Sequence, residues 1–309
     1  MTPWIPERVL VVSNDSPDYF TDGLADGFLR WLGPQRVRVH LRIERSRHHL
    51  CFKQLWPLYD WMEQATWDWE PAQADLVVLS CRNLEATQPP VTIVPNVPCA
   101  VIDGHDHPEL LLGYPSHTLL FKAQLPKTVT YEGTRIRPFP CMVFPTYDPG
   151  GLLWPTRTIR AFFSGTNSNN SRGPIVDLLR NRPGCVGMLD TPMPSDGYVV
   201  MLKNTQVGVS CHGAYSDAYR YWEVPYYGAL LLSERPLHHI QDDFVEGREA
   251  LFFSGVEECQ EKLDWVMQHQ EEASTIARAG FHKVYMNHLT VHRAQYVTRE
   301  IGAVWPLSS

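Results

Sequence analysis

The sequence lacks a run of apolar residues long enough to cross a membrane. None of its apolar stretches approaches the roughly 18 residues that a spanning helix needs. The N-terminal segment MTPWIPERVLVV has neither a basic start nor a long apolar core, so we expect no signal peptide. Positive charge is also scarce: the net charge of −7 argues against a nucleic acid as the main partner.

Paired cysteine motifs and glycine fingerprints are missing as well. The seven cysteines are odd in number, widely scattered and never spaced as CxxC. This usage is typical of reduced thiols and predicts a cytoplasmic protein. No Gly-rich phosphate fingerprint follows the first apolar run, Arg8 to Ser13, which argues against an ordinary dinucleotide site. We expect no bound cofactor.

Length and composition point to two α/β domains. A chain of 309 residues with 44% hydrophobic and 20% charged residues is long enough to bury a core in each of two domains. Proline and glycine gather between Arg137 and Pro155, where turns rather than regular elements are expected. We therefore predict a first domain over 1–140, a linker over 141–156 and a second domain over 157–290.

The first domain carries short apolar runs that end in polar residues. Arg8–Ser13, Asp75–Ser80 and Cys99–Asp103 have the length and composition of buried parallel strands. Gly23–Leu32 has apolar residues on one helical face and predicts an amphipathic helix. Leu50–Trp69, rich in Trp and Leu, predicts a second helix.

The third of these strands ends in a polar loop, DGHDH, over 103–107. Three interpretations stay open: a solvated turn, a metal site, or a loop that holds an acceptor hydroxyl or acts as general base. No third ligand group lies nearby in the sequence, so we predict no metal. Asp103 and His105 are the candidate catalytic residues of this domain.

The second domain is organised around one stretch, Gln206 to Pro236. Val207–Ser210 predicts a buried strand. After a loop, Ser216 or Asp217 is expected to cap a helix. Gly228 suits the residue just past the end of that helix, and Ala229–Leu232 predicts the next strand. Such a βαβ unit places its loops at the carboxyl edge of a parallel sheet.

An earlier strand of this domain also ends in a loop suited to an anion. Ile159–Ser164 predicts a strand that runs into a polar loop from Gly165 to Gly173. A glycine lets the backbone approach a ligand, and Arg172 with backbone N–H groups favours an anion. A plain surface loop is the alternative.

Several of these features resemble a known family. The pattern R-x-x-E-x-x-x-x-G, formed by Arg220, Glu223 and Gly228, resembles the donor-binding segment of GT-B glycosyltransferases. It is similar in particular to group-1-like proteins related to the spore-maturation protein CgeB. The resemblance covers roughly 157–300 and includes Ala277–Gly280, similar to the family's helix end, and a last helix over about Ala277–Arg299.

The resemblance implies an α/β fold of the GT-B type, with two Rossmann-like domains facing a central cleft. It also implies that a tail over 291–309 returns to the first domain. Phe121–Gln124 resembles the family's F-K-R-E-like segment but lacks its Arg and Glu. Lys122 is therefore a further candidate for chemistry in the cleft, with a solvated lysine as the alternative.

The resemblance assigns roles to individual residues. By the resemblance, Glu223 would hold the ribose of the donor. Arg172 and Arg220 are candidate cations for its diphosphate, and His212, from its place in the loop after the strand, could contact a donor phosphate or sugar hydroxyl, with a solvated His as the alternative. Because Arg220 and Glu223 are three residues apart, they could instead pair on one helix face. The catalytic candidates are thus Asp103, His105 and His212. The donor-binding candidates are Gly165, Arg172, Gly213, Tyr215, Ser216, Arg220 and Glu223.

The function that follows is a metal-independent glycosyltransferase of class EC 2.4. It would move a sugar from a nucleotide-sugar donor to an unknown acceptor, which is a glycan, a protein or a small molecule. Retaining members carry a first Glu eight residues before the second, and Tyr215 stands at that position here. A non-catalytic nucleotide-sugar or glycan-binding protein is therefore the alternative, and a two-Rossmann epimerase is a third.

Overall fold

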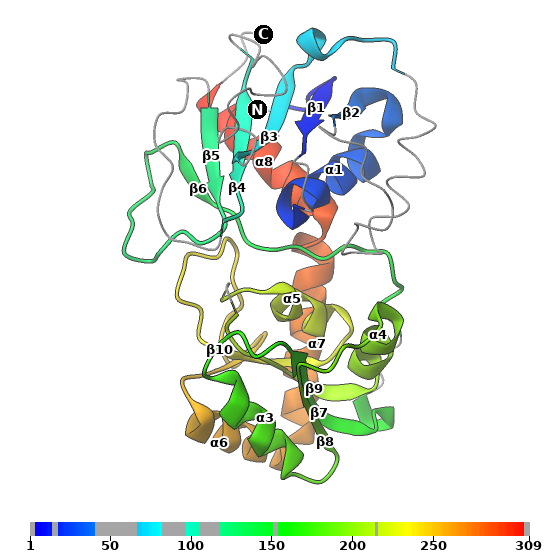
Figure 1. The fold of residues 1–309 in the computed structure, drawn as a ribbon, viewed down its shortest axis with the longest axis vertical. Coiled ribbons are helices and arrows are strands. Elements are labelled where there is room, and N and C mark those ends of the chain that lie inside the picture. Colours follow the sequence, from blue (N-terminus) through cyan, green and yellow to red (C-terminus); the bar gives the residue numbers. More distant parts are fainter. Residues whose placement is uncertain are drawn as a thin grey trace. The chain divides into compact units, whose positions relative to one another are not determined.

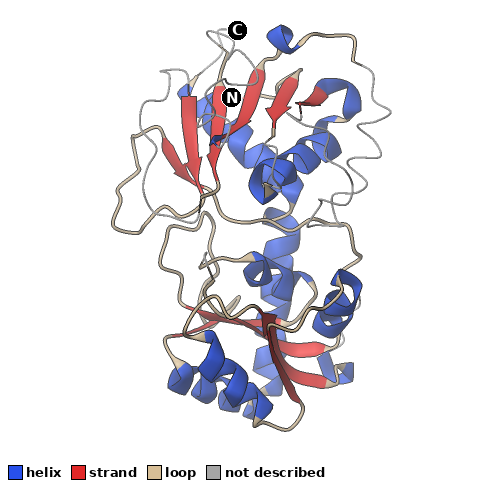
Figure 2. Cartoon of the chain, in the orientation of Figure 1, coloured by secondary structure: helices blue, strands red, loops and turns tan. Residues whose placement is uncertain are grey.

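A computed structural model shows a chain that folds into two compact units, residues 1–146 with 289–309 and residues 147–288 (Figures 1 and 2). Each unit is built on its own parallel sheet, with helices packed against it. None of the helices in the described part of the chain is long and apolar enough to cross a membrane. The structure describes residues 4–13, 18–40, 67–81, 97–105, 118–150, 154–213 and 216–305.

The sheet of the first unit has six strands in the order β2-β1-β3-β4-β5-β6, and every neighbouring pair is parallel. Strands β1, β3, β4 and β5 are buried along their whole length, as the continuous apolar runs predict. The strands are β1 (Val9–Val12), β2 (Val37–His40), β3 (Leu76–Ser80), β4 (Cys99–Asp103), β5 (Thr118–Lys122) and β6 (Ile136–Pro138). The helices are α1 (Tyr19–Leu32) and α8 (Thr290–Val304), with 3-10 turns η1 (Pro34–Arg36) and η4 (Pro71–Gln73).

Helix α1 begins earlier than its apolar pattern predicts. The carboxylate of Asp18 accepts hydrogen bonds from the backbone N–H groups of Phe20 and Thr21 at 3.2 and 3.4 Å. Such a cap satisfies donors that the first helical turn leaves free. The helix therefore starts at Tyr19 rather than at Gly23. Most of the helix predicted over Leu50–Trp69 lies outside the described residues, and Trp67 to Trp69 are not helical.

Helix α8 belongs to the first unit although it ends the chain. A Cβ added to Gly27 of α1 would lie 2.1 Å from the carbonyl oxygen of Thr290, so only glycine allows this close approach. The Thr290 hydroxyl donates to Asp26 at 2.5 Å. The Arg293 guanidinium donates to the Cys141 carbonyl at 2.9 Å. Buried polar contacts of this kind tie the end of the chain to α1 and to the segment after β6.

The sheet of the second unit has five parallel strands in the order β11-β10-β9-β7-β8. Helices α3 and α6 cover one face, and α4 and α5 lie on the other (Figures 1 and 2). The strands are β7 (Ile159–Gly165), β8 (Cys185–Leu189), β9 (Thr205–Ser210), β10 (Leu230–Glu234) and β11 (Leu251–Phe253). The helices are α3 (Arg172–Arg180), α4 (Ser195–Lys203), α5 (Tyr219–Tyr226), α6 (Val256–Gln268) and α7 (Gln270–Asn287), preceded by η6 (Trp154–Thr156).

The predicted βαβ unit is present as β9, α5 and β10. Gly228 has φ of 75°, the left-handed conformation expected just past a helix end. The predicted cap is wrong, because Ala218 occupies the N-cap position and no side chain bonds there. Ser216 and Asp217 instead bind His238, a partner that local sequence does not reveal.

The predicted last helix over Ala277–Arg299 is also wrong, because two helices, α7 and α8, replace it. Gly280 does not end a helix but lies inside α7, where a Cβ would approach the Glu249 carbonyl oxygen to 2.5 Å. The helix is interrupted between α7 and α8, where the backbone N–H of Thr290 donates to the carbonyl of Val143 at 3.0 Å rather than to a carbonyl of α7. This bridge interrupts the helical ladder.

Candidate functional site

The candidate donor site lies at the carboxyl edge of the second sheet. Strands β10, β9 and β7 are neighbours, so the loops after them meet at one edge. Parallel sheets bind ligands at this edge because it gathers loops and helix N-termini. Gly165 ends β7 and Glu234 ends β10, while His212 follows β9.

Arg172 holds two of these loops together. It is the first residue of α3, and it is buried, with 5% of its surface exposed. The guanidinium donates to the carbonyl of His212 at 2.8 Å and to that of Thr166 at 2.7 Å. Burial and the nearby guanidinium of Arg220 lower the pKa of Arg172. A bound anion would offset the repulsion between the two guanidinium groups and raise the pKa of Arg172 again.

Arg220 approaches the same point from α5. Its Nη2 donates to the Ser164 carbonyl, and its guanidinium carbon lies 4.5 Å from the centroid of the Phe163 ring. A Cβ on Gly165 would lie 3.0 Å from Nη2 of Arg220 and 3.5 Å from Nη1 of Arg172. Within the described part of the chain, the buried Nε of Arg220 has no hydrogen-bond partner. Two guanidinium groups thus converge on Gly165, where a side chain would intrude between them.

Glu223 is half-buried one turn further along α5. Burial raises the pKa of its carboxyl to about 7, while the nearby Arg220 guanidinium and the Tyr198 hydroxyl of α4 oppose the rise. Among the described residues, no ion pair joins Arg220 to Glu223, because the arginine donates to the carbonyl of Ser164. The edge therefore offers cations and a separate carboxylate, a combination that suits a diphosphate joined to a diol.

The pKa of Glu223 makes stability depend on pH. Because the folded pKa of about 7 exceeds the ordinary 4.5, the folded protein keeps a proton that the unfolded chain releases in this window. Stability from this group is therefore full below about pH 4.5 and is lost as the pH rises through 7. At about 1.4 kcal/mol per pH unit, the loss is at most about 3 kcal/mol.

Glu223→Gln should remove this pH dependence. Urea unfolding at pH 5 and at pH 8, without nucleotide, should show that the variant gains stability relative to the wild type as the pH rises. Glu261→Ala, which changes an exposed carboxylate of α6, is the control and should follow the wild type. A constant difference between wild type and Glu223→Gln at both pH values would contradict the assigned ionisation.

His212 is held by its backbone, and one nitrogen of its ring, Nε2, faces no described partner. Its N–H donates to the carboxylate of Glu234, which also accepts from the Ser171 hydroxyl at 3.0 Å. Burial lowers the pKa of the imidazole despite the Glu234 carboxylate nearby, so the ring is neutral near pH 7. Its Nε2 is buried and has no partner among the residues that the structure describes. A neutral imidazole of this kind can accept or donate a hydrogen bond to a ligand.

The remaining predicted donor residues differ in their surroundings. Gly213 lies beside Arg172, since a Cβ there would come 2.5 Å from Nη2. The Ser216 hydroxyl is engaged by His238 and by the backbone N–H of Leu237 at 3.3 Å. His238 in turn contacts Asp217 at 3.0 Å, so these residues stabilise the start of α5. Tyr215 lies outside the described residues.

A second polar cluster lies in the first unit, at the carboxyl ends of β3, β4 and β5. Nδ1 of His105 is 3.1 Å from Oδ1 of Asp103. Nζ of Lys122 is 3.3 Å from the other carboxylate oxygen, and Sγ of Cys81 is 3.3 Å from Nδ1 of His105. Asp103 and Lys122 are wholly buried, so Lys122 is not a solvated surface lysine. Asp106 and His107 of the same predicted loop lie outside the described residues.

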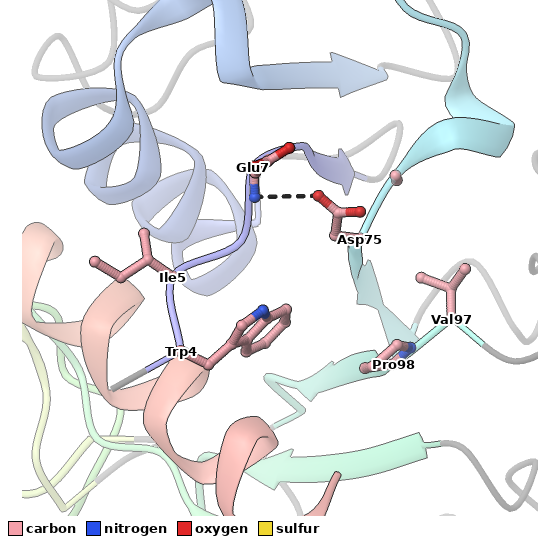
Figure 3. Close-up of a pocket in the computed structure, with 7 residues that line it drawn as sticks. Trp4, Ile5, Glu7, Asp75, Val97 and Pro98 are labelled. Carbon is pink, nitrogen blue, oxygen red and sulfur yellow. Dashed lines mark hydrogen bonds between the residues drawn. The ribbon is translucent and has the colours of Figure 1, made fainter. Parts of the chain in front are cut away.

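A hollow of about 490 Å³ lies elsewhere in the first unit (Figure 3). Asp75 is one of two carboxylates in its lining, and one of its oxygens accepts backbone N–H groups from Glu7 and Arg8 at 3.1 and 2.9 Å. The lining residues flank the amino ends of β1, β3 and β4, away from the Asp103 cluster. We assign no function to this hollow. Its walls are formed by Trp4, Ile5, Glu7, Ala74, Asp75, Val97 and Pro98.

Sequence reasoning missed three residues of these clusters. Glu234 orders the loop after β9, Tyr198 faces Glu223, and Cys81 joins the Asp103 cluster. A signal existed for Glu234 and Cys81, because each stands at the end of an apolar run where a parallel strand reaches the carboxyl edge. Tyr198 gave none, since its contact depends on how α4 packs.

Comparisons with known proteins agree with this architecture. Residues 188–299 match a family described as glycosyl transferase-like, and no curated protein matches the chain. A glycosyltransferase from Rickettsia africae ESF-5 has a TM-score of 0.65 at 9% identity, over 99% of this chain and 100% of that one. HepE from Anabaena, in complex with UDP-glucose, has a TM-score of 0.61 at 10% identity, over 96% and 99%. A UDP-GlcNAc 2-epimerase from Neisseria meningitidis, bound to UDP-GlcNAc, has 0.50 at 11%, over 96% and 99%.

At these identities the likeness shows the fold. The chain is an α/β protein of two parallel sheets with helices, and GT-B glycosyltransferases are among its structural neighbours. The predicted fold class is confirmed.

Proposed function

We propose that the protein is a glycosyltransferase that moves a sugar from a nucleotide-sugar donor to an unidentified acceptor, within the group related to CgeB. The observation that carries the proposal is the convergence of Arg172 and Arg220 on Gly165, next to the half-buried carboxylate of Glu223. Uridine diphosphate sugars are the first donors to test, because HepE, a structural neighbour, is in complex with UDP-glucose.

The arginines would take the place of a metal at the diphosphate. The leaving diphosphate carries negative charge that must be stabilised as the sugar departs, and fixed cations in a buried site do this. Arg172 is itself held by two carbonyl groups, so it orders the loops, and Arg220 keeps a buried Nε for the ligand. His212 would bond a donor phosphate or a sugar hydroxyl through its Nε2.

The acceptor would be served by Asp103 and His105 of the first unit. A carboxylate 3.1 Å from an imidazole nitrogen can orient the ring and stabilise the charge it gains as general base. The buried Lys122 lies 3.3 Å from the other oxygen of Asp103 and fixes the position of the carboxylate beside the imidazole, so that the pair can take a proton from an acceptor hydroxyl. The six described cysteines form no disulfide with one another, which supports our proposal of a cytoplasmic protein.

A panel of nucleotide sugars tests the proposal. Thermal-shift titration with UDP, GDP, ADP, CMP and dTDP species identifies the nucleotide, and product analysis of the matching nucleotide sugars measures donor hydrolysis without an acceptor. Release of free sugar supports transfer chemistry. Tyr215, where retaining relatives have Glu, favours the non-catalytic alternative, which predicts tight binding without release. An epimerised nucleotide sugar as product would identify an epimerase instead.

Metal independence gives a separate prediction. We expect UDP affinity to be unchanged and donor hydrolysis not to fall in excess EDTA, because arginine charges rather than Mg²⁺ would face the diphosphate. Isothermal titration with and without EDTA measures the first, and sugar release the second. Loss of either that Mg²⁺ or Mn²⁺ restores would show that a metal bridges the diphosphate.

A further inference from the structure

Three potential metal ligands meet at the carboxyl edge of the first sheet. β3 and β4 are parallel neighbours with Ser80 opposite Ile102, so the residues that follow these two, Cys81 and Asp103, come to the same level. His105 lies two residues beyond Asp103. Cys81 and Asp103 are buried, with exposures of 1% and 0%, whereas 16% of the His105 side chain is exposed.

The spacing of the three ligand atoms suits a tetrahedral ion. Sγ of Cys81 lies 3.3 Å from Nδ1 of His105 and 3.8 Å from Oδ1 of Asp103, and Nδ1 lies 3.1 Å from Oδ1. Zn²⁺ takes sulfur at about 2.3 Å and nitrogen or oxygen at about 2.0–2.2 Å, which places neighbouring ligand atoms about 3.3–3.6 Å apart. Shifts of a few tenths of an ångström would bring the three atoms into that geometry.

The surrounding groups hold the carboxylate in the required orientation. Nζ of Lys122 is 3.3 Å from Oδ2 of Asp103 and 3.4 Å from the carbonyl of His105, to which it donates. The backbone N–H of His105 donates to Oδ1 at 3.1 Å. Oδ2 therefore forms an ion pair with the lysine, although it accepts no hydrogen bond among the described residues, and Oδ1 faces Cys81 and His105. Outer contacts that fix a ligating carboxylate in this way strengthen metal sites.

We propose that Cys81, Asp103 and His105 form a binding site for Zn²⁺. A sulfur, a nitrogen and a single carboxylate oxygen select zinc over Mg²⁺ or Ca²⁺, which prefer oxygen ligands throughout. The three residues leave a fourth tetrahedral position to another ligand. On binding, the sulfur–zinc bond forms as the Cys81 thiol releases its proton to solvent.

The site and the base role of Asp103 and His105 exclude each other. Zinc would use the lone pairs that a general base needs, so the zinc-loaded protein should bind nucleotide normally and transfer poorly. The inference itself does not rest on the proposed function, because zinc binding is measured without nucleotide. The alternative for the cluster is a hydrogen-bonded trio with no metal.

Cobalt titration of the full chain tests the site. We expect one Co²⁺ per chain, with the near-ultraviolet absorption of a thiolate–cobalt bond, displaced by one equivalent of Zn²⁺. Cys81→Ala should abolish this absorption and weaken zinc binding, measured against a chromogenic chelator, at least about a hundredfold, the upper end of the effect of losing an outer contact. Cys99→Ala, which removes another buried cysteine of the same sheet, should change neither.

A second variant covers the case in which Cys81→Ala fails to fold. His105→Gln removes the most exposed ligand, so it should fold, lose zinc affinity by a similar factor and keep the thiolate absorption at saturating cobalt. Wild type without thiolate absorption at one equivalent of Co²⁺ would overturn the proposal. Absorption that persists in Cys81→Ala, or zinc affinity unchanged in His105→Gln, would overturn it as well.

Discussion

Arg220→Met should lower the rate of donor hydrolysis by about a hundredfold to a thousandfold, the usual effect of removing one donor that faces developing negative charge. Methionine keeps the contact with the Phe163 ring, above which the guanidinium lies at 4.5 Å, but it removes the charge and the free Nε. Affinity for the nucleoside diphosphate should fall as well. Steady-state sugar release and calorimetric titration measure the two effects.

Two further variants make this experiment decisive. Arg220→Lys should recover little, because a lysine is a point charge that cannot donate to Ser164 and to a phosphate as a planar fork does. Arg278→Met removes an exposed arginine from α7 and should behave as wild type. If Arg220→Met folds, as judged by thermal unfolding, and retains both turnover and affinity, the arginine pair does not bind the diphosphate.

Glu223→Ala should weaken the binding of the nucleoside diphosphate by about tenfold to a few hundredfold. Losing a hydrogen bond from the ribose diol to a charged acceptor costs roughly 1.5–3 kcal/mol, and each factor of ten in affinity corresponds to about 1.4 kcal/mol. Glu223→Gln keeps one acceptor and should lose less. Because the pKa of Glu223 is about 7, wild-type affinity should itself fall as the pH drops from 8 to 6.

Calorimetry at pH 8, where the carboxylate is ionised, separates ribose binding from a purely structural role. Glu261→Ala, on the exposed face of α6, is the control and should bind as wild type does. Equal affinities for wild type and a folded Glu223→Ala would mean that the carboxylate only packs against Tyr198. The donor assignment would then depend on the likeness of fold alone.

The elements around the donor site were readable from the sequence because their signals are local. Val207–Ser210 is a short apolar run bounded by polar residues, and it forms most of β9. Gly228 marks the end of α5 through its left-handed backbone. Both are properties of a few consecutive residues, and a buried parallel strand has the same apolar character wherever it lies in a sheet. The α/β class and the order of elements near the site follow from such patterns.

Contacts between distant segments could not be read in the same way. Ser216 and Asp217 have the composition of a helix cap, yet their side chains bind His238, which lies beyond the next strand. Gly280 looks like a helix end, but it lies inside α7, where the lack of a side chain lets the Glu249 carbonyl oxygen approach closely. In both cases the residue serves a contact with a distant segment that its neighbours in the sequence do not reveal.

By itself, the sequence determined that the chain is an α/β protein, that its strands are buried, and which strand ends carry polar chemistry. Only the tertiary structure decided which of those ends meet. The order β10-β9-β7 brings Arg172, Arg220 and Glu234 to one edge, and β3-β4-β5 brings Cys81, Asp103 and Lys122 to another. The physical reason is that strand order and register arise from packing between residues far apart in the chain, whereas apolar periodicity reports only on neighbours.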